Sequence, residues 1–307
     1  MRKTMRELWL TSPAKINLTL EVLGKRPDGY HELDMLVVTV DLSDRIALSV
    51  RPDGHITLAS SATHIPLDEK NLAYRAARTL KEASGTPLGA HIAIDKHIPV
   101  SAGLGGGSSN AATVLIGLNE LWDLGLDHTA LAQLGADVGS DVPFFLYGGT
   151  ARVGGRGERV EPLPDVGPWS VILVRPPVSV STTDVFRAFD VRTAPPPGAT
   201  EAAVRSLLAG DRRAVLEYLR NDLEAVTMER YPEVRSLKEK MRRYGATYTL
   251  MSGSGPTVFA VFPDARRARR IVHSLRGFLK EVYLVQTLTS GRCSAALRHA
   301  GVGEIKG

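Results

Sequence analysis

A glycine-rich segment in the first half of the chain constrains its fold more than any other feature. Three consecutive glycines, Gly105–Gly107, are followed directly by Ser108 and Ser109. Alternating residues at 91–98 predict a strand before them, and an apolar series at helical spacing predicts a helix after them: Ala112, Leu115, Leu118 and Trp122. Backbone N–H groups and the positive end of a helix converge in such a loop, where an anion can bind. A flexible turn is the alternative for a glycine cluster considered in isolation.

The two best-known phosphate loops do not match this segment. A Walker A loop requires a lysine after its last glycine, and no lysine follows Gly107. A dinucleotide-binding fingerprint requires glycine where this chain has Ser108. Ser108 and Ser109 are equally consistent with capping the helix and with contacting a phosphate or a metal. Any phosphate loop here is therefore of another type.

Length and composition indicate an ordinary globular protein of two domains. The chain has 307 residues, of which 43% are hydrophobic and 23% charged, and this disfavours coiled-coil, collagen-like and disordered classes. A single cysteine, Cys293, cannot form an intramolecular disulfide or a thiolate zinc site. Charges break up the first 15 residues, and glycines and serines break up residues 97–119, so we expect neither a secretory signal nor a membrane span. These features predict a cytoplasmic protein.

The chain is basic, with a formal charge of +5 and a sequence pI near 9.3. Such a charge favours anionic partners: nucleic acid, an acidic membrane surface or a small phosphorylated ligand. The densest basic groups are Arg242–Arg243 and the arginines within 266–270. Apolar residues at helical spacing accompany the second group: Ala265, Ala268, Ile271, Val272 and Leu275. The pattern predicts an amphipathic helix with solvated arginines, and the lack of interleaved aromatic residues disfavours a nucleic-acid surface.

Periodicity and turn residues divide the chain into two halves. The elements expected in the first half are strands and tight turns over 7–58, a helix over 71–84, the strand, glycine loop and helix described above, a helix over 127–134, a loop at 139–143 and a strand from 144 to 153. Proline and glycine at 160–167 place a domain boundary near residue 165, giving domains 1–165 and 166–307. The elements expected in the second half are an irregular connection at 194–199, helices at about 200–228, at 232–244 and from 264, and strands at 246–251, 257–262 and 281–287. Helices on one face of a small antiparallel sheet make this half α+β.

Three segments resemble the motifs of the GHMP kinase superfamily in order and spacing: Ser12–Leu33, Pro99–Ala112 and Ser252–Phe262. The resemblance implies an α+β fold of two domains, the first like domain 2 of ribosomal protein S5 and the second ferredoxin-like. It implies ATP and Mg²⁺ as cofactors, and we assign no residue as a metal ligand. The residues implied to bind ATP are Asn71, Leu72 and Lys96, around the adenine and ribose, and the loop residues Pro99, Val100, Ser101, Ala102, Gly103, Leu104, Gly105, Gly106, Gly107, Ser108 and Ser109.

Within this superfamily, the sequences Pro13–Asn17 and Asp28–His31 are similar to the branch that acts on a cytidine diphosphate-linked methylerythritol. The resemblance implies ATP-dependent phosphorylation of the 2-hydroxyl of this alcohol, a step of the non-mevalonate route to isopentenyl diphosphate. The residues implied to bind the substrate are Asn17, near the reacting centre, and Tyr30, His31, Thr182 and Phe186, around the cytidine. Taken alone, Phe186 would be an ordinary core aromatic residue.

The same resemblance implies two catalytic residues. Asp141 would accept the proton of the attacking hydroxyl, and Lys15 would keep this carboxylate ionised and stabilise the substrate oxygen. Local sequence alone would make Asp141 a turn or cap residue and Lys15 a surface charge. The chain departs slightly from the family pattern at Ser140, where the family has alanine.

Two other functions remain open. A GHMP kinase for a non-nucleotide alcohol would keep the glycine loop and Asp141 but would need no cytosine site, so Tyr30, His31 and Phe186 discriminate between the two enzymes. A nucleic-acid-binding protein is the second alternative, and its binding would weaken steeply with salt. We expect ATP and the cytidine-linked substrate as partners, no nucleic acid or membrane, and a monomer or homodimer.

Overall fold

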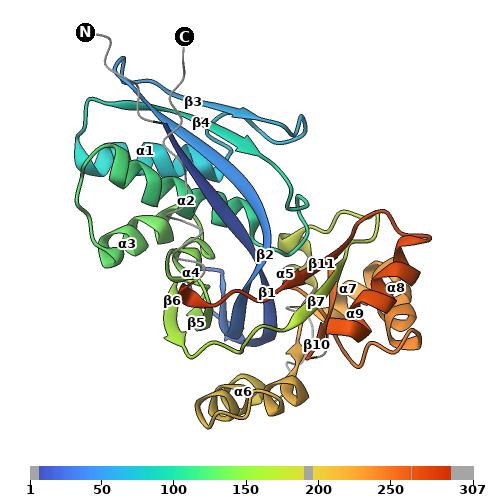
Figure 1. The fold of residues 1–307 in the computed structure, drawn as a ribbon. Helices are drawn as coiled ribbons and strands as arrows, with labels where there is room; N and C mark the ends of the chain where they lie inside the picture. Colours follow the sequence, from blue (N-terminus) through green and yellow to red (C-terminus); the bar gives the residue numbers. More distant parts are fainter. Residues whose placement is uncertain (1–6, 190–195, 264, 292–307) are drawn as a thin grey trace.

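The computed structural model describes residues 7–189, 196–263 and 265–291. Cys293 and part of the connection predicted at 194–199 lie outside these residues. The longest strands are β1 (Glu7–Lys25) and β2 (His31–Arg51), which pair in antiparallel fashion and run diagonally through the molecule (Figure 1). Strands and tight turns predicted over 7–58 are thereby confirmed.

The first half of the chain builds a mixed sheet with helices packed on it. Besides β1 and β2, its strands are β3 (Ile56–Ser60), β4 (Gly89–Asp95), β5 (Thr150–Gly155) and β6 (Arg159–Leu163). They lie in the order β3-β4-β2-β1, and β5 pairs with β2 and with β6. The helices are α1 (Leu72–Ser84), α2 (Gly106–Leu121), α3 (His128–Val138) and α4 (Val142–Tyr147). Figure 1 shows α1, α2 and α3 together on one side of β1 and β2.

Two helices of this half begin where the sequence predicts. The side chain of Asn71 caps α1 by accepting a hydrogen bond from the N–H of Ala73, and α1 ends at Gly85 in the left-handed conformation. Helix α2 follows the glycine loop and packs on β1 and β2. Gly117 lies so close to Leu10 and Leu48 of the sheet that a side chain there would clash with both.

The second half builds a four-stranded antiparallel sheet. Its strands are β7 (Ser170–Val174), β9 (Tyr248–Met251), β10 (Val258–Phe262) and β11 (Val282–Gln286). In space they lie in the order β11-β7-β10-β9, with β7 and β10 at the centre. Helices α8 (Pro232–Arg243) and α9 (Ala265–Arg276) pack on this sheet and alternate with its strands along the chain. This is the ferredoxin-like arrangement that the family resemblance implied.

Residues after 165 also contribute to the first sheet. The region predicted as helical over 200–228 contains α6 (Ala199–Leu208), the 3₁₀ helix η1 (Ala214–Tyr218), the strand β8 (Arg220–Asn221) and α7 (Glu224–Arg230). Strand β8 pairs in parallel with β1, and α6 packs on β1 and β2. The domain boundary near residue 165 stays a prediction.

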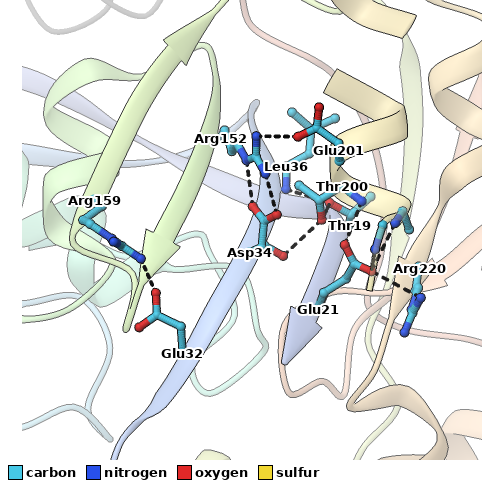
Figure 2. A network of polar contacts seen from close by, with 12 residues as sticks. Thr19, Glu21, Glu32, Asp34, Leu36, Arg152, Arg159, Thr200, Glu201 and Arg220 are labelled. Carbon is cyan, nitrogen blue, oxygen red and sulfur yellow. Dashed lines mark hydrogen bonds and ion pairs between the residues drawn. The ribbon is translucent and has the colours of Figure 1, made fainter. Parts of the chain in front are cut away.

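Polar contacts fasten α6 to the first sheet (Figure 2). The carboxylate of Glu21 in β1 is buried and accepts hydrogen bonds of 2.9, 3.1 and 2.8 Å from the N–H groups of Gly198, Ala199 and Thr200. It also forms an ion pair of 3.2 Å with Arg220. A carboxylate at the start of α6 satisfies N–H groups that have no partner within the helix.

Several further elements differ from the sequence prediction, and strand β6 is one that was not predicted. The strand predicted from Phe144 to Val153 is wrong in its first part, because Phe144 lies in helix α4 and the strand β5 begins only at Thr150. Pro143 in the first turn favours a helix, whereas the apolar run after it fits a buried strand equally well. Strand β7 and helix α5 (Thr182–Phe189) were not predicted, although the continuous apolar sequence of β7 is typical of a fully buried strand.

Strand β1 turns different side chains to the core and to the functional site. Ala14, Ile16 and Leu18 lie in a buried cluster with residues of the second sheet and of α6. Lys15 and Asn17 alternate with them and point to the opposite face. The pairing of β1 with β2 shifts register between Pro13 and Ala14 and again after Asn17, so irregularities bracket these two polar residues. Such irregularities often re-aim side chains beside active sites.

Candidate active site

A cavity of about 1110 Å³ brings together most of the residues that the sequence singled out. β1, β2, the start of α1, the glycine loop, the loop before α4, α5 and the loop between β9 and β10 all contribute to its wall. The predicted site residues that line it are Lys15, Asn17, Tyr30, His31, Asn71, Leu72, Lys96, residues 99–108, Asp141, Thr182 and Phe186. Ser109 does not line the cavity: it is buried, and its hydroxyl accepts a hydrogen bond of 2.8 Å from Ser12 Oγ.

The glycine loop has a backbone that side chains would not tolerate. Gly103 and Gly105 have positive φ values of 74° and 70°, and Ser101 has φ of 53° although it carries a side chain. A Cβ atom on Gly103 would clash with the carbonyl oxygen of Ser252, and Ser252 Oγ donates a hydrogen bond of 2.9 Å to the carbonyl of Gly103. The segment Ser252–Phe262, identified as a motif from the sequence, therefore packs directly against the loop.

The first turn of α2 is open to a ligand. Its N-cap residue is Gly105, which has no side chain that could bind the first N–H groups of the helix. Gly106 and Gly107 begin α2 with ordinary helical backbone, and both line the cavity together with Ser108. The N–H groups of the first turn, which have no partner within the helix, and the positive end of α2 thus face the cavity, as an anion site requires.

Lys15 and Asp141 meet in the wall of the cavity. Lys15 Nζ lies 3.6 Å from Asp141 Oδ2, and the side chain of Lys15 is only 7% exposed whereas that of Asp141 is 38% exposed. Lys15 Nζ also donates a hydrogen bond of 2.7 Å to Asn17 Oδ1. Asp141 directly precedes α4, but its side chain does not cap that helix. Lys15 is therefore not a surface residue, and the carboxylate of Asp141 remains available to a ligand in the cavity.

Asn71 and Lys96 are held by the protein before any nucleotide binds. The amide of Asn71 caps α1 and donates a hydrogen bond of 2.8 Å to the carbonyl of Pro66. Lys96 Nζ lies 2.8 Å from the carboxylate of Asp44, which is fully buried. Burial lowers the pKa of Lys96, and the charge and hydrogen bond of Asp44 oppose this shift. Both residues can thus shape the wall of the cavity.

Aromatic side chains line a further part of the cavity, which we call the aromatic end. His31 stacks on Phe186 with ring centroids 4.9 Å apart and an angle of 28° between the ring planes. Tyr30 is half-exposed, and the guanidinium of Arg156 lies 5.2 Å from the centroid of its ring. Thr182 and the loop residue Ser254 share a hydrogen bond of 2.8 Å between their hydroxyls. This end offers flat apolar surfaces and a cation.

Sequence reasoning missed several residues of the site. Four further cations line the cavity: Lys25, Lys70, Arg156 and Arg187. Lys25 is the last residue of β1 and lies within the first motif segment, Ser12–Leu33. The other three lie outside the three motif segments, and no spacing rule connects them with the site. Asp44 also escaped notice, because it looks like an ordinary turn-flanking acid in Asp41–Arg45 and only the fold buries it.

The donor set bears on the expected Mg²⁺. The described residues include no cluster of three or more His, Cys, Asp or Glu side chains arranged for a metal ion. Mg²⁺ in nucleotide sites needs no such cluster, since it keeps waters and binds mainly to phosphate oxygens and one or two protein oxygens. The Ser108 hydroxyl at the glycine loop offers an oxygen of this kind.

In the described part of the chain, no helix is both long and apolar enough to cross a bilayer.

Comparison with known proteins identifies the class to which this site belongs. Residues 71–149 match the family model of the GHMP kinases N terminal domain, and residues 203–281 match that of the GHMP kinases C terminal domain. The chain belongs to the GHMP kinases and is a small-molecule kinase. A relative from Shouchella clausii (strain KSM-K16) is 49% identical over 285 residues, which cover 92% of this chain and 96% of the relative. A relative from Geobacillus kaustophilus (strain HTA426) is 49% identical over 282 residues, which cover 92% and 97%. Both are named 4-diphosphocytidyl-2-C-methyl-D-erythritol kinase, and within the GHMP kinases this chain belongs to their family.

Solved structures agree with this assignment. The crystal structure of a 4-(cytidine 5'-diphospho)-2C-methyl-D-erythritol kinase is 37% identical to the chain, with a TM-score of 0.75 over 91% of this chain and 98% of that one. A homoserine kinase from Cytophaga hutchinsonii is 21% identical with a TM-score of 0.76 over 94% and 97%. The second match shows the shared fold alone. The fold class expected from the sequence motifs is confirmed.

Proposed function

We propose that this protein transfers the γ-phosphoryl group of ATP to the 2-hydroxyl of 4-diphosphocytidyl-2-C-methyl-D-erythritol, in the non-mevalonate route to isopentenyl diphosphate. One observation carries the proposal most directly. The buried Lys15, which contacts Asp141 and Asn17, lies in the same cavity as an open helix N-terminus and an aromatic end. A kinase for a nucleotide-linked alcohol needs these three parts: a reacting centre, a phosphate loop and a place for the base.

Asp141 is the proposed base. Its carboxylate is partly exposed to the cavity, so it can accept the proton of the 2-hydroxyl as the oxygen attacks phosphorus. Lys15 at 3.6 Å positions the carboxylate and stabilises the negative charge that develops on the substrate oxygen. Asn17 orients the lysine, because an ammonium group only donates and must therefore face the oxygen of the amide.

The glycine loop is the proposed site of the ATP phosphates. Gly105, Gly106 and Gly107 leave backbone N–H groups open, and the dipole of α2 favours negative charge at this point. Ser108 is the residue that would hold Mg²⁺ together with phosphate oxygens. When bound, Mg²⁺ neutralises charge on the transferring phosphoryl group. Asn71, Leu72 and Lys96 would border the adenine and ribose.

The aromatic end is the proposed cytidine site. His31 already covers one face of Phe186, so the cytosine ring would stack on the opposite face of Phe186, and Tyr30 would add a second flat surface. The diphosphate linking the cytidine to the reacting alcohol would lie between this end and Asp141. Arg156 lines the cavity beside Tyr30 and adds positive charge where such an anion must pass.

Identification of the product tests this proposal. The protein is incubated with ATP, Mg²⁺ and the cytidine-linked substrate, and phosphorus NMR follows the reaction. We expect ADP and one new phosphomonoester on the alcohol, with the diphosphate bridge intact. A protein that instead consumes ATP with homoserine or mevalonate and leaves the cytidine compound unchanged would be a GHMP kinase of another specificity.

A further inference from the structure

One buried carboxylate outside the sequence motifs holds both ends of the glycine loop. Asp44 in β2 is fully buried. Its Oδ1 accepts hydrogen bonds of 2.7 and 2.8 Å from the N–H groups of His97 and Ile98. Its Oδ2 accepts bonds of 2.8 Å from Lys96 Nζ and 3.1 Å from Asn110 Nδ2. Four donors from two separate segments thus converge on one side chain.

These donors flank the loop along the chain. His97 and Ile98 directly precede its first residue, and Asn110 lies in the first turns of α2 just after its last residue. We propose that Asp44 is a positioning residue for ATP: it fixes the distance between the two ends of the glycine loop and thereby the direction of its N–H groups. Asp44 does not line the cavity and acts through the residues it holds.

Lys96 connects this clamp to the start of α2. A Cβ atom on Gly106 would lie 3.1 Å from Lys96 Nζ and 3.0 Å from Ile98 Cγ2, so the lysine head group packs against the first residue of the helix. The ammonium is nearly buried, and Asp44 is its ion-pair partner. Removing the carboxylate would leave this buried cation beside the phosphate loop without its counter-charge, which is strongly unfavourable.

The chemistry of position 44 requires a carboxylate. An asparagine there could still accept the two backbone hydrogen bonds through its oxygen. Its NH₂ group would then face the ammonium of Lys96, which would keep its hydrogen bond to the carbonyl of Ile98 but lose its counter-charge. Asn110 would have to turn its Oδ1 toward position 44 to keep a hydrogen bond there. Asp44→Asn therefore changes the clamp with almost no change in side-chain volume.

The orientation of Asn110 supports a specific role. Because a carboxylate only accepts, Asn110 must turn its Nδ2 toward Asp44. Its Oδ1 is then buried and has no hydrogen-bond partner among the described residues. The fold thus keeps α2 attached to Asp44 although one buried acceptor, Asn110 Oδ1, stays without a partner among the described residues. This cost indicates that the contact between Asn110 and Asp44 has a role.

ATP affinity separates this role from a purely structural one. Glu21 provides the matched control, because it is also buried, accepts backbone N–H groups and pairs with a cation, but it lies outside the cavity lining. Asp44→Asn and Glu21→Gln are compared with the wild type in Tm, in the Kd for ATP and in KM for each substrate. The inference rests on the proposed ATP site and not on the identity of the acceptor.

We expect Asp44→Asn to raise the Kd for ATP about tenfold or more, the equivalent of about 1.4 kcal/mol, while KM for the acceptor stays within about twofold. Glu21→Gln should lower Tm and leave the Kd for ATP unchanged. If Asp44→Asn fails to fold, Asn110→Ala decides, because it cuts the α2 side of the clamp and should still raise the Kd for ATP. Asn110 borders the cavity but is only 2% exposed, so a loss of affinity would come from the clamp rather than from a lost contact with ATP. Folded variants with the wild-type Kd would overturn the clamp. An equal loss of ATP and acceptor binding in Asp44→Asn and in Glu21→Gln would also overturn the clamp. A wild type that binds no ATP would instead overturn the proposed function.

Discussion

At the scale of single residues, Lys15 differs from an ordinary surface lysine because its side chain is buried beside a carboxylate. Nothing in the local sequence predicts that a lysine between Ala14 and Ile16 is 7% exposed and faces a carboxylate 126 positions away along the chain. The family resemblance implied that Lys15 lies beside Asp141, and the structure shows this contact. Asp44 marks the limit of motif reasoning, because its hydrogen-bond donors come from two segments that reach it only in the folded protein.

Asp141→Asn tests the proposed base. The amide cannot accept the proton of the attacking hydroxyl, so we expect kcat to fall roughly 10²- to 10⁴-fold while the protein still folds and binds ATP. Asp137→Asn is the matched control, since Asp137 is an exposed acid in the preceding helix and does not line the cavity. Near-normal turnover in a folded Asp141→Asn would remove this residue as the base.

Phe186→Ala tests the proposed cytosine stack. A base stacked on an aromatic ring contributes about 1–3 kcal/mol, so kcat/KM for the cytidine substrate should fall roughly tenfold to a hundredfold. The Kd for ATP should hardly change. Phe278→Ala removes an exposed ring outside the cavity and should leave both quantities at wild-type values. Unchanged kcat/KM in Phe186→Ala would place the cytidine elsewhere.

At the scale of elements, the sequence predicts helices best where the hydrophobic periodicity agrees with the residues that begin and end a helix. Asn71 and Gly85 mark both ends of α1, and three glycines mark the start of α2, so these helices were located correctly. Helix α4 was mistaken for a strand because its six residues are too few to show a period. Strand β7 was missed because it is buried on all sides and shows no alternation.

The glycines of the loop should differ in their tolerance of a side chain. A Cβ atom on Gly105 would lie 2.7 Å from Phe145 Cζ, and its φ of +70° disfavours alanine in addition. We expect Gly105→Ala to lower the free energy of unfolding by about 1–3 kcal/mol. Gly107→Ala meets only Leu72 Cδ1 at 3.6 Å and should change it by less than about 1 kcal/mol. Chemical denaturation without nucleotide measures both, and equal stability would show that the loop can relax.

At the scale of the whole molecule, the two halves depend on each other. Strand β8 and helix α6 come from the second half but pack on β1 of the first, and Glu21 secures the start of α6. The sequence predicted two domains but not that elements of the second half pack on the first. Strand β8 has only two residues, and the contact of Glu21 with the start of α6 joins distant parts of the chain, so neither leaves a periodic signal. The cavity lies where the halves meet, so the relation between them also shapes the site.

Acid should weaken this connection through Glu21. Burial would raise the pKa of Glu21, but hydrogen bonds from Thr200, Ala199 and Gly198 together lower it below its usual range. A lowered pKa in the folded state stabilises the protein above the unfolded value of about 4.3, and this stabilisation is lost as pH falls through the folded pKa. Between about pH 5 and about pH 3, the free energy of unfolding should therefore fall more steeply in the wild type than in Glu21→Gln. Parallel pH profiles would contradict this assignment.

The central claim is that the cavity recognises a cytidine diphosphate handle and uses it to position a small alcohol beside Asp141. The reacting alcohol offers few groups by which it can be held, so remote binding energy must supply its orientation. The most direct test compares kcat/KM for the cytidine-linked substrate with kcat/KM for free methylerythritol 4-phosphate in the wild type. We predict a preference for the cytidine-linked substrate of about a hundredfold or more, the equivalent of about 2.8 kcal/mol. Equal efficiency on both compounds would contradict the account and favour a kinase for a non-nucleotide alcohol.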